Sequence, residues 1–248
     1  MTAKRRTNAL AALLLVPTLG MSSGCALLDA LTETSAVVDV FATSHGEPDD
    51  EGNLPSRNGH QVIFVNDMGW EIFIDDAVIT TEGVTLRSCD GEDFEVEFYW
   101  GALAETFDEN PDYDVTGLGG VRATTGQYCD ALVDYGPSAE GMDNPAAEGS
   151  TVFLSGSAVK GDMHIDFEWR TDLALTVDVD VSKIQNGRPF DIQDGASSAK
   201  KLTIAKSYTG FFAGIDFEDE LSQADVDSLL IDTLQQTTLA YAGTIAPQ

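Results

Sequence analysis

Oxygen-bearing side chains stand at every second position of one acidic stretch: Asp108, Asn110, Asp112 and Asp114. Carboxylate and amide oxygens at this spacing are ligands with which a loop wraps around a calcium ion. Two positions depart from a high-affinity calcium loop. Tyr113 replaces the glycine that makes the sharp turn, and Gly119 stands where a bidentate glutamate belongs. We therefore interpret the stretch as a solvated acidic loop, with a calcium site as the alternative.

A second set of potential ligands lies in an alternating segment, where His164, Asp166 and Glu168 share one face of a predicted strand. Neighbours on such a face are about 6.8 Å apart along the strand. Metal ligands must approach one ion to within about 2 to 2.6 Å. A metal site at His164 would therefore need ligands from an adjacent strand, and a solvated face is the simpler interpretation.

The sequence lacks the motifs of common catalytic sites, including G-x-S-x-G and H-E-x-x-H. Ser157 and Lys160, like Ser197 and Lys200, match Ser-x-x-Lys, but no Ser-Asp-Asn or Lys-Thr-Gly accompanies them. We expect no catalytic residues and no enzyme. An enzyme with an acidic site of unrecognised type is the alternative.

The N-terminus joins three segments in a fixed order. Lys4, Arg5 and Arg6 precede an apolar run over residues 9–16, and small residues then lead to Cys25. This order resembles the signal peptide of bacterial lipoproteins, although Ser22 replaces the usual leucine. The resemblance implies cleavage before Cys25 and acylation of its sulfur and new amino group. An uncleaved anchor helix is the alternative, but the run is shorter than the ~20 apolar residues of a membrane span.

This interpretation divides the chain and locates it. Residues 1–24 would be the signal peptide, and residues 25–60 a tether with a first strand near 36–41 and a polar loop. Residues 61–248 would form the folded domain. Because Ala26 is not Asp, resemblance to sorted lipoproteins implies a membrane anchor outside the cytoplasm, at the outer membrane or periplasmic face.

Three cysteines are present, and Cys25 is assigned to the lipid. Cys89 and Cys129 remain in an exported and therefore oxidising environment, so we predict that they form a disulfide.

The chain is strongly acidic, with 13 Lys and Arg against 42 Asp and Glu, and a net charge of −29. Removing three basic signal residues changes this to 10 − 42 = −32. Such a chain repels nucleic acids and anionic lipid surfaces. Adaptation to a salty medium is the preferred explanation, with divalent cations as potential partners.

The body of the sequence alternates apolar and polar residues in many short segments, typical of strands with one buried face. The clearest are residues 61–65, 70–75, 78–86, 94–100, 128–135, 151–159, 163–170, 173–181, 201–204 and 211–217. We predict a mainly β fold, an antiparallel β-sandwich of immunoglobulin-like or jelly-roll-like type. Trp70, Trp100 and Trp169 alternate with polar neighbours, so we place all three in the core.

The period changes near the C-terminus. Ser222 and Asp225 have the spacing of a capping box, and the apolar residues that follow share one helical face. We predict one helix from Gln223 to about Ala240, packed on the sandwich.

Three stretches carry a family resemblance: residues 69–75, residues 126–129, and residues 154–158 leading to 163–169. In this order they resemble exported lipoproteins with a sandwich of the MbnP-like copper-binding kind. The resemblance implies copper binding through His together with a modified Trp. His164 and Trp169 match by residue type, without a shared ligand motif.

These observations favour a lipid-anchored, acidic β-sandwich lipoprotein that acts as a non-enzymatic binding or structural module. A metal-handling lipoprotein, with copper before calcium, is the alternative. The sequence names no cofactor and no protein partner.

Overall fold

The computed structural model describes residues 35–47, 49, 51–106, 114–139, 145–193 and 199–244. Every described element belongs to one compact unit, Thr34–Gln248. Its elements are β1 (Ser35–His45), β2 (Ser56–Asn58), β3 (Gln61–Val65), β4 (Glu71–Ser88), β5 (Asp93–Glu95), β6 (Glu97–Phe98), β7 (Leu103–Thr106), β8 (Thr116–Thr124), β9 (Gly126–Tyr135), η1 (Pro145–Ala147), β10 (Val152–Lys160), β11 (Met163–Thr171), β12 (Leu175–Asp180), β13 (Phe190–Ile192), β14 (Lys200–Ser207), η2 (Thr209–Phe212), α2 (Gln223–Thr237) and β15 (Leu239–Ala242).

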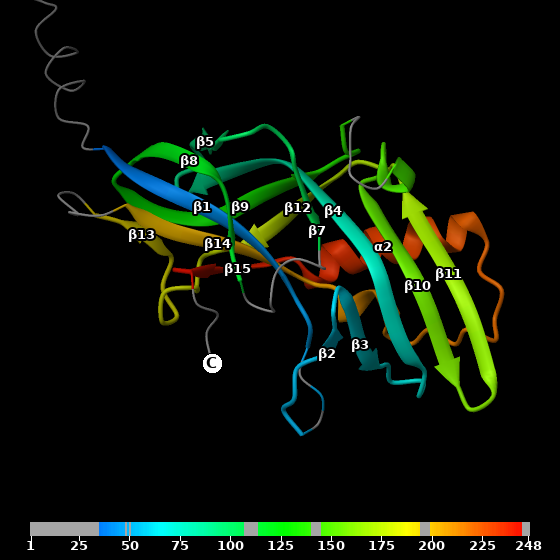
Figure 1. Cartoon of the computed structure of the whole chain (residues 1–248). Helices are drawn as coiled ribbons and strands as arrows, with labels where there is room; N and C mark the ends of the chain where they lie inside the picture. The colour runs from blue at the N-terminus through cyan, green and yellow to red at the C-terminus, as the bar shows by residue number, and fades with distance from the viewer. Residues whose placement is uncertain are drawn as a thin grey trace, which may run out of the picture. The chain divides into compact units, whose positions relative to one another are not determined.

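The strands form two sheets (Figure 1). The first has the order β15-β14-β1-β8-β6, and its β1–β14 pair is parallel while its other pairs are antiparallel. The second sheet follows the path β11-β10-β4-β3-β2, with β5, β7 and β9 also on β4 and with β12 and β13 on β9. The predicted mainly β sandwich with one α-helix is confirmed for the described part of the chain.

β4 organises the second sheet because it is long enough to change partners along its length. Its first half pairs with β10, and its second half, from Thr81 to Ser88, pairs with β9. The β4–β10 register shifts between Ser155 and Gly156. A Cβ at Gly156 would collide with the carbonyl oxygen of Phe73, so this close approach of two strands requires glycine.

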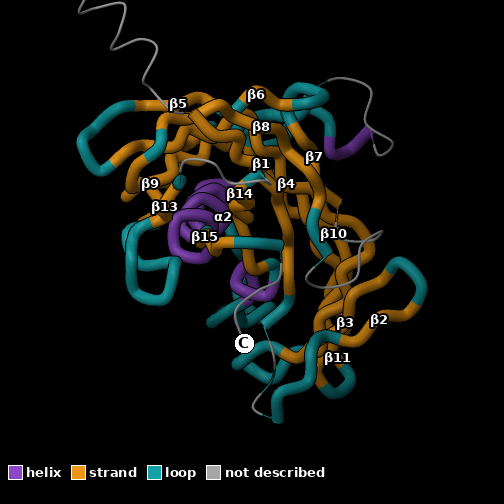
Figure 2. The backbone as a smooth tube through the Cα atoms, turned by 90° about the vertical axis from the view of Figure 1, so that its left-hand side faces the viewer, coloured by secondary structure: helices purple, strands orange, loops and turns teal. Residues whose placement is uncertain are grey.

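α2 packs against β11 and β14, and Figure 2 shows it beside β14 and β15. The capping box at its start is formed: the Ser222 side chain accepts from Asp225 N, and the Asp225 side chain accepts from Ser222 N. Val226, Leu230 and Leu234 are buried on its inner face. The helix ends at Thr237, earlier than the predicted Ala240, because Leu239–Ala242 pairs with β14 instead.

One core prediction is wrong. Trp70 and Trp169 are buried, but Trp100 is 91% exposed. β6 ends at Phe98, so Trp100 falls in the bend after the strand, where alternation no longer determines which face a side chain takes. None of the helices in the described ranges is long and apolar enough to cross a membrane.

Candidate functional site

A hollow of about 420 Å³ lies between β11 and the segment that leads from η2 into α2. We call it the β11 groove. Its lining residues are Ile165, Asp166, Phe167, Glu168, Trp169, Ile215, Asp216, Phe217, Glu218, Asp219, Glu220, Leu221, Gln223 and Val226. Apolar residues line its base, and carboxylates line its rim.

The base is a stack of aromatic rings. Alternation along β11 directs Phe167 and Trp169 to the core face, where both are less than one-tenth exposed. The Trp169 ring stacks on Phe217 with centroids 5.5 Å apart and planes 8° apart, and on Phe212 with centroids 5.3 Å apart. Stacked rings add about 0.5–1.5 kcal/mol per pair beyond their burial, so this base is a rigid surface.

The second wall is held by two residues that follow β3. The buried Asn66 donates from Nδ2 to the carbonyl oxygens of Phe212 (3.1 Å) and Ile215 (2.8 Å). Asp67 accepts from Gly214 N at 2.7 Å. Asn66 Oδ1 also accepts from Trp70 N at 2.9 Å. These bonds fix residues 212–216 against β3 although the chain segments are far apart in sequence.

Asp216 connects the rim to the aromatic base. Its Oδ1 accepts from Glu218 N at 3.2 Å and from Trp70 Nε1 at 3.0 Å. These hydrogen bonds, that of Glu218 first, hold the pKa of the Asp216 carboxyl below its usual value of 3.8. The ammonium of Lys160 lies 5.3 Å from the Trp70 ring centroid. Beside the groove, outside its lining, the chain therefore already holds a cation against an aromatic face and near the Asp216 carboxylate.

The number of carboxylates distinguishes the groove from the other described hollows. Six carboxylates line it, and its described lining contains no Lys, Arg or His. A larger hollow of about 930 Å³ between β5, β6 and β8 also combines acids with aromatic rings. There Arg122 is part of the lining, and Asp93 is bound by Arg87 at 2.7 Å. Both hollows thus have a cation beside them, Lys160 near Asp216 at the groove and Arg87 at the larger hollow, but only the larger hollow has a basic residue in its lining.

The predicted metal ligands are not brought together in the described structure. Asp108, Asn110 and Asp112 lie outside the described residues, whereas Asp114 is described and exposed. The His164 Nε2 lies 3.0 Å from Asp166 Oδ1, and both side chains are solvent-exposed on β11. Within the described ranges, no group of three or more His, Cys, Asp or Glu side chains has the arrangement of a metal site.

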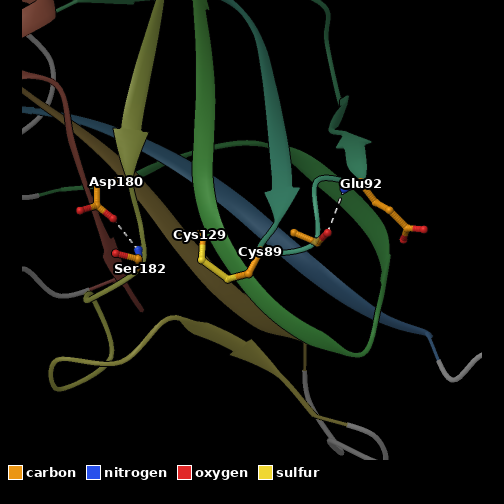
Figure 3. The surroundings of a disulfide bond; sticks show 6 residues. Cys89, Glu92, Cys129, Asp180 and Ser182 are labelled. Atoms are coloured by element: carbon orange, nitrogen blue, oxygen red, sulfur yellow. Dashed lines mark hydrogen bonds between the residues drawn. A yellow bond between two sulfur atoms is a disulfide. The ribbon is translucent and has the colours of Figure 1, made fainter.

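Cys89 and Cys129 form the predicted disulfide, with Cα atoms 4.9 Å apart. Figure 3 shows the bond joining the end of β4 to β9. The backbone supports it, because Cys89 N donates to Gln127 O at 2.9 Å. Cys25 lies outside the described residues, so its lipid remains a prediction.

One buried ion pair could not be predicted from the sequence. Lys206 on β14 is fully buried, and its Nζ lies 2.8 Å from Glu105 Oε2 on β7. The predicted strand of residues 201–204 ends before Lys206, and alternation carries no information about a partner 101 residues earlier. The pair connects the two sheets.

Comparison with solved structures finds similarity to MbnP from Methylosinus trichosporium. The TM-score is 0.37 at 10% sequence identity, over 76% of this chain and 80% of that chain. This is a loose resemblance and carries no argument about function. No protein-family model and no curated protein sequence matches the chain.

Proposed function

We propose that this chain is an exported, lipid-anchored module without enzymatic activity, and that it binds cationic groups in the β11 groove. The observation that carries the proposal is the charge of that groove: six carboxylates surround an aromatic base without a basic residue in the described lining. A cation placed there is attracted by the carboxylates, and its apolar substituents can contact the aromatic base. The position of Lys160 over Trp70 provides an example within the same chain.

The chemistry of the rim favours binding over catalysis. A carboxylic acid that donates a proton near neutral pH needs a raised pKa. Asp216, which is hydrogen-bonded at the groove, has its pKa lowered and stays ionised. The described lining also lacks Ser, Cys, His and Lys, the usual nucleophiles and bases. A carboxylate held in its charged form at Asp216 suits recognition of a cation.

The cation proposal can be tested with the three indole N–H signals of the full chain in nonionic detergent. Benzyltrimethylammonium is the probe, because it combines a fixed positive charge with an apolar ring. We expect saturable shifts of the Trp70 and Trp169 indole signals. Trp100 is the internal control, since it is 91% exposed on the bend after β6, and Trp100→Phe assigns its signal.

Charge-matched variants locate the binding. Glu168→Gln with Asp219→Asn removes two charges from the rim, and we expect it to weaken binding at least threefold. Glu95→Gln with Asp178→Asn removes two exposed charges elsewhere and should have no such effect. Equal shifts of all three indole signals, or equal weakening by both double variants, would contradict binding in the groove.

The lipid anchor is tested separately by Cys25→Ser. The motivation is the basic, apolar and Ser-Gly-Cys order of residues 4–25. We expect the variant to be unprocessed or released into the soluble fraction, without bound acyl chains by mass spectrometry. A processed variant that still partitions with membranes would disprove lipidation at Cys25.

A further inference from the structure

β11 is an edge strand. It pairs with β10 and, among the residues that the structure describes, with no other strand. The two strands meet in a hairpin whose two-residue turn is Gly161-Asp162, and Gly161 has the positive φ of 62° that the first position of a type II′ turn needs. The register from Lys160–Met163 to Val152–Thr171 contains no bulge.

This register determines which backbone groups of β11 face outward. The residues that close a two-residue hairpin form a hydrogen-bonded pair, and such pairs alternate along an antiparallel ladder. Met163, Ile165, Phe167 and Trp169 therefore exchange hydrogen bonds with β10. His164, Asp166 and Glu168 direct their N–H and C=O groups away from β10, along the β11 groove.

The next outward group, the carbonyl of Arg170, has a partner that confirms this alternation. Gln223 at the start of α2 donates from Nε2 to Arg170 O at 2.8 Å and to Asp227 Oδ1 at 2.9 Å. The open edge therefore runs from His164 to Glu168. Five residues of strand span about 17 Å.

Proteins usually protect such an edge with charged side chains, proline or a bulge. Between His164 and Glu168, β11 has no lysine, proline or bulge, and its protecting charges are the carboxylates of Asp166 and Glu168. Its outward-facing backbone lies between two rows of carboxylates, Asp166 and Glu168 on the strand itself and residues 216–220 across the groove. This arrangement repels a second copy of the same acidic strand, and it attracts a basic strand.

We propose that the ligand of the β11 groove is an extended basic peptide segment of another protein, which adds to the sheet as a strand beside β11. The main chain of the peptide pairs with His164, Asp166 and Glu168, which supplies affinity without requiring a particular sequence. Its side chains point alternately to the two faces of the sheet. One set contacts the aromatic base and the acids of residues 216–220, and the other set contacts Asp166 and Glu168. Because both faces carry carboxylates, lysine or arginine at alternate positions of the peptide finds acidic partners on whichever face it points to.

This inference rests on the proposed cation-binding function and adds the strand geometry to it. The probe is the capped peptide Lys-Val-Lys-Val-Lys-Val-Lys, titrated into the full chain at low salt. Two analogues carry N-methyl groups on the valines or on the lysines. In a strand, the N–H groups of alternate residues point to opposite edges, so only the valine set or the lysine set can face β11. We therefore expect one analogue to lose at least tenfold in affinity while the other binds nearly as well as the parent.

Hydrogen exchange supplies the structural readout. Peptide binding should slow exchange of the Asp166 and Glu168 amides, whereas the Ile165 and Phe167 amides should be protected with or without peptide. Asp166→Pro removes an outward N–H at an edge position where proline is tolerated, and Asp166→Asn removes the charge alone. We expect the proline variant to bind at least fivefold more weakly than the asparagine variant.

The outcomes separate the two proposals. If both N-methylated analogues bind like the parent, or the Asp166 and Glu168 amides do not slow, strand addition is wrong while cation binding stands. If the indole signals respond to benzyltrimethylammonium but the peptide does not bind, strand addition is again wrong. If neither probe binds, both proposals fail. If the chain dimerises and these amides are protected without peptide, the partner strand belongs to a second copy of the chain, and the basic-peptide proposal is wrong.

Discussion

The surroundings of Asp216 favour the charged form of its carboxylate. Its oxygen accepts from the backbone of Glu218 and from the indole of Trp70, and the ammonium of Lys160 lies nearby. All three favour the carboxylate over the neutral acid. Through its hydrogen bond to Trp70, this rim carboxylate of the β11 groove is also fixed relative to the neighbouring aromatic rings.

The lowered pKa of Asp216 predicts a pH dependence of stability. A group whose pKa is lower in the folded state stabilises the fold above its unfolded pKa, and this stabilisation is lost as the pH falls through the folded pKa. For Asp216→Asn we therefore expect a lower unfolding free energy at neutral pH and a smaller loss below about pH 4. Urea unfolding between pH 2.5 and 7 measures both.

Glu95→Gln, an exposed change on β5, is the control for general acid effects. The argument for Asp216 would be wrong if Asp216→Asn and the control gave curves of the same shape relative to the parent chain.

At the scale of elements, two side-chain links hold the strands in their arrangement. The buried pair of Lys206 and Glu105 joins β14 of one sheet to β7 of the other. The disulfide joins the end of β4 to β9 within the second sheet. Each link connects strands that are distant in sequence, so each reduces the freedom of one strand relative to another.

Breaking the ion pair on one side should be severe. Lys206→Met leaves the Glu105 carboxylate buried without its cation, and we expect a loss of about 3–5 kcal/mol in unfolding free energy. Lys206→Met with Glu105→Met replaces the pair by apolar side chains and should recover most of that loss. Denaturant unfolding of the three chains measures this. A double variant as unstable as the single one would show that packing, and not the unpaired charge, explains the effect.

Removing the disulfide should destabilise the fold mainly through the unfolded chain. Cys89 and Cys129 are separated by 40 residues, and the chain-entropy model assigns about 4 kcal/mol to closing such a loop. For Cys89→Ser with Cys129→Ser we expect a loss of about 2–4 kcal/mol, measured by denaturant unfolding. Dithiothreitol should lower the parent to a similar value and leave the double variant unchanged. A double variant as stable as the oxidised parent would contradict this.

Across the whole molecule, acidic residues outnumber basic ones by 42 to 13. Ion pairs in the described part of the chain include Arg87 with Asp93, Lys206 with Glu105, and His164 with Asp166 when the imidazole is protonated. Most carboxylates therefore repel one another over the folded surface, and folding brings them closer together.

This repulsion predicts that salt stabilises the chain. Ions screen charges over about 10 Å at 0.1 M, so the thermal midpoint should rise between 0.02 and 1 M sodium chloride, by a similar amount with potassium chloride. Magnesium or calcium should raise it further by pairing with acid clusters. Circular dichroism melts measure this. A midpoint that does not change up to 1 M sodium chloride would rule out repulsion as a main term.

Many local features of this protein were predictable from the sequence, although the predicted strand over residues 211–217 is wrong, since the end of the η2 helix and turns occupy it. Period-two alternation indicates strands because successive side chains point to opposite faces, as in β11. The capping box at Ser222 was visible because its two partners are three residues apart. Pairing of Cys89 with Cys129 followed from the small number of cysteines. Trp100 was misplaced because alternation indicates a face only while the strand continues.

The candidate site depended on the tertiary structure. The bond between Trp70 and Asp216 spans 146 residues, and the bond between Asn66 and Ile215 spans 149. The open edge of β11 follows from the order of strands in the sheet, which no single strand encodes. Local patterns determine which side of a strand is buried. Packing between distant segments decides which carboxylates meet, which rings stack, and which edge remains available to a partner.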